Sequence, residues 1–245
     1  MEGALPLRLS TAAIPATGAR EHMVAVTVGL PVAARSTSGH EFALTVFVFD
    51  GEGRKEVSRQ THNVTVSPAV SRTDTLAEVV LALKLAPGRY NLRVGAQSGE
   101  TAGSAFTVVT VPDLSREPLT LSAVAIGRAE GRPIGGREVV AASLPFAPTT
   151  VRAFDAGDHV GALVTLHQSR TASDVSVRTE ILDASGAVVT VAAHTVAAAS
   201  FHDAAGHQYK YNLPLRTLVP GEYLLRIVAS TARSTVRRDV RFVIH

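Results

Sequence analysis

Leu85-Ala86-Pro87-Gly88-Arg89-Tyr90-Asn91-Leu92-Arg93-Val94 and Leu218-Val219-Pro220-Gly221-Glu222-Tyr223-Leu224-Leu225-Arg226-Ile227 are the two stretches that decide the fold of this chain. They share the pattern Leu-x-Pro-Gly-x-Tyr, and the second follows the first by 133 residues. The same offset places Asp50 on Asp183 and Gly53 on Gly186. Because self-similarity at a fixed offset is the mark of a repeated structural unit, the sequence indicates one domain duplicated in tandem.

The repeated motif predicts a tight turn followed by a strand. Proline presets φ at the first corner of a turn, and glycine takes the positive φ that a type II turn requires next. The tyrosine then begins a strand, and its hydroxyl can reach back to the turn backbone, as in the tyrosine corner of immunoglobulin-like sandwiches. We therefore predict structural roles for Pro87, Gly88, Tyr90, Pro220, Gly221 and Tyr223.

Alternating hydrophobic residues predict strands in both copies. Apolar side chains occupy every second position in two upstream segments, 24–30 and 160–166, and turn-forming residues such as Asp50-Gly51 separate the predicted strands. Alternation with a period of two is typical of half-buried strands, and short strands at this spacing favour a sandwich. We predict an all-β chain with two tandem immunoglobulin-like or fibronectin-type β-sandwich domains, at residues 1–112 and 113–245.

One pair of segments is ambiguous by composition. Residues 75–85 (TLAEVVLALKL) could form an amphipathic helix, whereas their repeat partner, residues 208–218 (QYKYNLPLRTL), alternates and contains Pro214. We predict strands for both segments. The short, proline-bracketed stretch between Val111 and Pro118 is too short for a flexible tether, so we expect a semi-rigid joint there.

Composition excludes several classes of function. The 245 residues include no cysteine, so disulfides and thiolate metal sites are ruled out. The formal net charge of +3 is too weak to indicate nucleic-acid binding. No run reaches the roughly 18 apolar residues of a membrane span. The last predicted strand carries Arg233, Arg237, Arg238 and Arg241, and such a basic patch could meet an acidic polymer or an anionic membrane surface. We favour instead a solvent face with Arg237 and Arg241, where charge on an outer strand prevents aggregation.

No grouping of residues indicates catalysis, a cofactor or a metal. Gly95-Ala96-Gln97-Ser98-Gly99 has the wrong spacing for a nucleophile elbow and lies where a hairpin turn belongs. His159 and His167 would share a strand face but lie far apart, and His202 and His207 could act only as loop ligands. Neither pair has a clear third ligand. We therefore predict that the chain is not an enzyme and has no cofactor.

The chain resembles the paired β-sandwich extension that follows a von Willebrand factor A-like domain in bacterial proteins of the acidobacterial type. The resemblance runs along most of the length of the chain, and the pieces that carry it are residues 5–10, 85–94, 111–114, 118–122, 148–154 and 218–227. The resemblance implies an exported accessory module, periplasmic or extracellular, whose partner is another protein or an upstream A-domain. The A-domain itself is not part of this sequence. Its metal loop reads Asp-x-Ser-x-Ser, and Asp113-Leu114-Ser115 has Glu117 where the second serine would stand, so no metal site is carried over.

Two hypotheses for function follow. The first is a non-catalytic structural or protein-interaction module that presents its sandwich surfaces or loops to a partner. The alternative is a carbohydrate-binding or adhesin-like module, which would need exposed aromatic side chains. The chain has no tryptophan and four tyrosines. With Tyr90 and Tyr223 assigned to turns, Tyr209 and Tyr211 are the one aromatic pair predicted as a binding site. The oligomeric state is left open.

Overall fold

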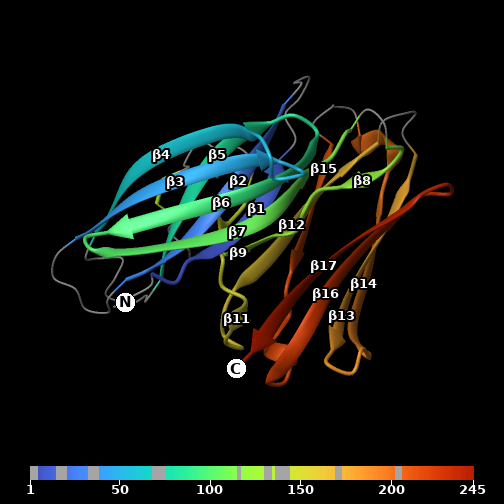
Figure 1. Cartoon of the computed structure of the whole chain (residues 1–245). Coiled ribbons are helices and arrows are strands. Elements are labelled where there is room, and N and C mark those ends of the chain that lie inside the picture. The colour runs from blue at the N-terminus through green and yellow to red at the C-terminus, as the bar shows by residue number, and fades with distance from the viewer. Residues whose placement is uncertain are drawn as a thin grey trace.

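The chain is almost entirely β-structure. The computed structural model describes residues 5–14, 21–32, 39–67, 76–114, 117–129, 134–135, 144–168, 173–201 and 206–245. Within these ranges, the regular elements are strands and two single 3-10 turns, η1 (Ala198–Ser200) and η2 (Leu215–Thr217). The strands form four sheets stacked as sandwiches (Figure 1), which confirms the predicted fold class.

The first sandwich stacks a three-stranded sheet on a four-stranded sheet. The three-stranded sheet has the order β1-β2-β5 and contains β1 (Arg8–Ile14), β2 (His22–Pro31) and β5 (Leu76–Leu85). The four-stranded sheet has the order β4-β3-β6-β7 and contains β3 (His40–Asp50), β4 (Glu56–Val66), β6 (Gly88–Ser98) and β7 (Thr101–Val111). Valine and leucine side chains from both sheets, including Val26, Leu44 and Leu92, fill the space between them.

The second sandwich repeats this plan with five strands in each sheet. One sheet contains β8 (Thr120–Leu121), β9 (Ala125–Arg128), β10 (Ala147–Pro148), β12 (Val160–His167) and β15 (His207–Asn212). The other has the order β11-β17-β16-β13-β14 and contains β11 (Ala153–Phe154), β13 (Val175–Asp183), β14 (Val188–Val196), β16 (Gly221–Ser230) and β17 (Thr235–Ile244). Its core contains the rings of Phe154 and Phe242, both fully buried.

The central strand pairs of the two halves have the same register. β3 pairs with β6 so that Val46 lies opposite Val94, and β13 pairs with β16 so that Thr179 lies opposite Ile227. Both residues of the second pair follow their counterparts by the offset seen in the sequence. The four-stranded sheet of the first half therefore corresponds, position by position, to β14-β13-β16-β17 of the second half.

The repeated turns place their tyrosine hydroxyls on the turn backbone. The Tyr90 hydroxyl donates to the carbonyl of Ala86 at 2.9 Å, and that of Tyr223 donates to the carbonyl of Val219 at 2.7 Å. The glycines differ from the type II expectation of about +80°, because φ is 158° at Gly88 and 159° at Gly221. Each glycine is the first residue of a strand, β6 or β16, and its backbone is therefore close to fully extended.

The ambiguous segment of the first half is a strand, but its repeat partner is only partly one. Residues 76–85 form β5, whereas β15 ends at Asn212 and η2 follows. Pro214 lies directly before η2. Because proline has no backbone N–H to donate to a ladder, the strand predicted through residue 218 ends before it.

The two sandwiches are joined by a third apolar cluster. Side chains on the outer face of the first three-stranded sheet, Ala12, Ile14 and Ala25, pack against Ala125, Leu144, Phe146 and Leu163 of the second half. Figure 1 places β1 and β2 beside β9 and β12 accordingly. The Phe146 ring lies so close to β9 that a Cβ on Gly127 would stand 2.0 Å from it. This packing explains why β2 and β12 are buried on both faces.

Polar contacts also cross the joint. Thr149 and Thr150 donate side-chain hydrogen bonds of 2.8 and 2.9 Å to the Glu78 carboxylate, and the Thr150 backbone N–H donates to the same oxygen. Ile134, from the second half, exchanges backbone hydrogen bonds of 2.8 and 2.9 Å with β5. Although the sheets divide the chain near residue 112, the second half thus contributes a backbone bridge to a sheet of the first.

Candidate binding face

The outer face of the four-stranded sheet carries aromatic and arginine side chains. Alternation along each strand turns one set of side chains to the core and the other to solvent. The solvent set includes the six residues that we call the aromatic–arginine face: Phe47, Phe49, Arg59, Arg93, Phe106 and Val108. Phe106 is 85% exposed and Val108 is 45% exposed. A large apolar side chain that stays in water forgoes about 1.5–3 kcal/mol of burial free energy, and β7 carries two of them only two residues apart.

Four of these residues form one row across the sheet. Arg59 lies opposite Phe47, which lies opposite Arg93, which lies opposite Phe106. The Arg59 guanidinium carbon is 4.8 Å from the Phe47 ring centroid, within cation–π range. Phe47 also stacks against Phe49, with ring centroids 6.4 Å apart. The row therefore alternates cation and ring, and Phe106 stands at its open end.

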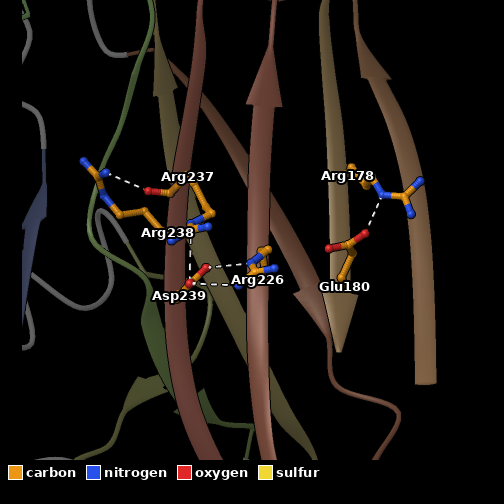
Figure 2. A network of polar contacts seen from close by, with 6 residues as sticks. All are labelled: Arg178, Glu180, Arg226, Arg237, Arg238 and Asp239. Carbon is orange, nitrogen blue, oxygen red and sulfur yellow. Dashed lines mark hydrogen bonds and ion pairs between the residues drawn. The ribbon is translucent and has the colours of Figure 1, made fainter. Parts of the chain in front are cut away.

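The corresponding face of the second half carries ion pairs instead. The equivalent row contains Val191, Glu180, Arg226 and Asp239. We call Arg178, Glu180, Arg226, Arg237 and Asp239 the charged face, shown in Figure 2. The closest N–O distances are 2.7 Å for Arg178–Glu180, 3.2 Å for Arg226–Asp239 and 3.4 Å for Arg237–Asp239. Arginines on this face, including Arg237 of the C-terminal cluster, have carboxylates of the same chain beside them.

Each of the two faces carries an arginine at the same position, but the neighbours of that arginine differ. Arg93 and Arg226 occupy equivalent positions, but Phe47 stands where Glu180 does and Phe106 stands where Asp239 does. Arg93 makes a long hydrogen bond of 3.5 Å to the Ser104 hydroxyl. Within the described residues it has no carboxylate at ion-pair distance. The first half thus presents a guanidinium between aromatic rings, a combination enriched in the energetic centres of protein interfaces.

The predicted tyrosine pair does not form an exposed platform. Tyr209 is 9% exposed, packs in the core of the second sandwich and shares a hydrogen bond of 3.0 Å with the Thr179 hydroxyl. Tyr211 is half-buried against the same core, and burial raises the pKa of its hydroxyl. The prediction placed both rings on one strand face correctly but assigned that face to solvent. It is the inner face of β15, so a flat ligand has no access to Tyr209.

Sequence reasoning missed the phenylalanines of the aromatic–arginine face. In β3, Phe42, Val46 and Val48 point inward, so Phe47 and Phe49 have the outward parity. The repeat offset adds a second signal, because it aligns Phe47 with Glu180 and Phe106 with Asp239. An aromatic residue aligned with a carboxylate between duplicated domains marks a position where the two surfaces differ in chemistry.

Histidines meet at the joint without forming a metal site. His22 and His167 are buried, and His22 Nδ1 and His167 Nε2 have no hydrogen-bond partner. Burial, with a smaller contribution from His22, lowers the pKa of His167 to about 4. Among the described residues, no three histidine or carboxylate side chains are grouped to hold a metal ion. His202 lies outside the described residues.

The described segments contain no helix with the length and apolarity that a membrane crossing requires.

Comparison with known proteins yields likeness of fold alone. No family model and no curated protein matches this chain. Among solved structures it is similar to parts of red sea bream transglutaminase (13% identity, TM-score 0.33, 98% of this chain and 31% of that one). It is also similar to parts of dimeric latent PorU from Porphyromonas gingivalis (16% identity, TM-score 0.38, 98% of this chain and 20% of that one). A third similar structure is Parabacteroides merdae β-glucuronidase (11% identity, TM-score 0.31, 95% of this chain and 30% of that one). The chain therefore spans less than a third of the length of each.

Proposed function

We propose that this chain is a non-catalytic protein-interaction module that binds its partner through the aromatic–arginine face. The observation that carries the proposal is the row Arg59, Phe47, Arg93 and Phe106, because at the positions of Phe47 and Phe106 the duplicate half carries the ion-paired carboxylates of Glu180 and Asp239. Burial of exposed aromatic rings is the main source of binding free energy in protein interfaces, and arginine is enriched beside them.

The rigid setting of the face supports the same proposal. The four-stranded sheet is paired along its full length, and its inner face belongs to a closed apolar core. The backbone of a paired sheet loses little further conformational freedom on binding, which reduces the entropic cost of association. Membership of an exported bacterial protein related to von Willebrand factor A proteins stays a prediction, and binding to a protein partner is compatible with it.

Photo-crosslinking from the face tests the proposal. We would replace Phe106 with p-benzoylphenylalanine in the full chain and expose it to an extract of the source organism. Val191, on the equivalent row of the second half, provides the matched control position. We expect a protein adduct from position 106 that is absent from position 191. Adducts of equal yield from both positions, or none from position 106, would contradict the proposal.

A further inference from the structure

We propose that the partner segment is acidic and apolar: one carboxylate pairs with Arg93 while flanking apolar side chains pack on Phe47 and Phe106. This inference rests on the proposed function and adds the chemistry of the partner. It starts from the comparison of the two halves, which share the arginine and its register but differ in what surrounds it.

The second half shows which group a guanidinium at this position binds. Arg226 directs Nε toward one oxygen of Asp239 at 3.2 Å and a terminal nitrogen toward the other at 3.4 Å (Figure 2). This is the two-pronged approach by which arginine recognises carboxylates. In the first half Phe106 occupies the position of Asp239, and among the described residues no carboxylate lies at ion-pair distance from Arg93, so a carboxylate of a partner can complete this arrangement.

The rings of the face favour a polypeptide over a polyanion. Arg59 lies over the Phe47 ring and itself pairs with Glu56 at 2.8 Å, and Phe49 stacks beside Phe47. Single-stranded nucleic acid requires several free ring faces and a basic track along its backbone. Here Phe106 is the ring with most of its surface free, and Val108, two residues further along β7, extends the exposed apolar surface beside it. Apolar side chains beside a single carboxylate match this pattern.

A peptide library provides the probe for this inference. We would select twelve-residue peptides from a random phage-displayed library on the full chain, and measure the binding of the selected peptides by fluorescence anisotropy. We expect enrichment of aspartate or glutamate next to large apolar residues. Arg93→Gln should weaken binding several-fold and flatten its dependence on salt, because the contact that it removes is an ion pair.

The duplicate half supplies matched variants. Phe47→Glu with Phe106→Asp installs the residues found beside Arg226, so the sheet should fold, and peptide binding should weaken at least tenfold. Glu180→Phe with Asp239→Phe should create a second peptide site on the charged face. Circular dichroism checks folding, and Phe106→Ala replaces the double variant if that variant is unfolded.

The outcomes separate this inference from the proposed function. Selected peptides that depend on Phe106 but are basic, or carry no charge bias, would overturn the acidic partner and leave the binding face intact. If no selected peptide depends on Phe106, both proposals fail. Displacement of the peptides by oligouridylate or polygalacturonate at lower concentration than by the peptides themselves would show that the partner class is wrong.

Discussion

Acidification should destabilise the chain through the histidines at the joint between the sandwiches. His167 lies at the end of β12 and is 4% exposed, and His22 lies at the start of β2 in the other half. Burial lowers the pKa of both side chains, and the two repel each other when charged, while Asp113 partly offsets this for His22. The folded chain therefore favours the neutral imidazole.

The sign and size follow from proton linkage. The pKa of His167 is about 4 in the folded chain and 6.5 in the unfolded chain, so the unfolded chain binds more protons between these values. The free energy of unfolding should fall as the pH drops from 6.5 to about 4. At about 1.36 kcal/mol for each tenfold difference in proton affinity, the total loss from His167 is about 3 kcal/mol.

Urea denaturation from pH 7.5 to 4 provides the assay. We would compare the wild type with His167→Gln, which removes the titrating group, and with His245→Gln, which removes an exposed imidazole at the C-terminus. The wild type and the His245 variant should lose about 3 kcal/mol more than the His167 variant over this range. Parallel curves for all three proteins would refute the reasoning that the joint holds His167 neutral.

Three further predictions concern the turns, the joint and the binding face. Tyr90→Phe and Tyr223→Phe should each lower the free energy of unfolding by about 1 kcal/mol, because each loses a hydrogen bond to the turn; unchanged urea midpoints for both would rule out that role. Glu78→Gln should lower the free energy of unfolding by about 1–3 kcal/mol in the same assay, because a carboxylate that accepts several hydrogen bonds is lost at the joint. Glu41→Gln, at an exposed position, is the control. An equal effect of the two substitutions would contradict this prediction. Phe106→Ala should leave the thermal midpoint unchanged, because its ring is exposed; a marked decrease would show that the ring stabilises the fold.

The sequence alone determined the fold class and the plan of each half. The Pro-Gly-x-Tyr turns are local, and the alternation of apolar residues in segments such as 175–181 depends only on which face of a strand is buried. The fixed offset then transferred each assignment from one half to the other. These signals needed no knowledge of distant contacts, and the all-β fold class that they predicted is confirmed.

Where the prediction of local structure was wrong, a particular residue explains it. The strand expected over 208–218 ends at Asn212, because Pro214 cannot donate to a ladder. Tyr209 and Tyr211 have the parity of one strand face, but parity alone does not tell which face is the core. The neighbours that cover Tyr209, among them Thr179 of the opposite sheet, are distant in the sequence.

Only the tertiary structure decided how the two sandwiches meet and which surface is left free. At the joint, the outer face of β2 is buried by the second sandwich and the outer face of β12 is buried by the first. Such contacts between whole sheets leave no periodic signal in either strand. The aromatic–arginine face depends on pairing across four strands, because Arg59, Phe47, Arg93 and Phe106 become one row only when the register aligns them. Alternation within a strand is encoded locally, whereas neighbours across strands are set by the fold of the entire chain.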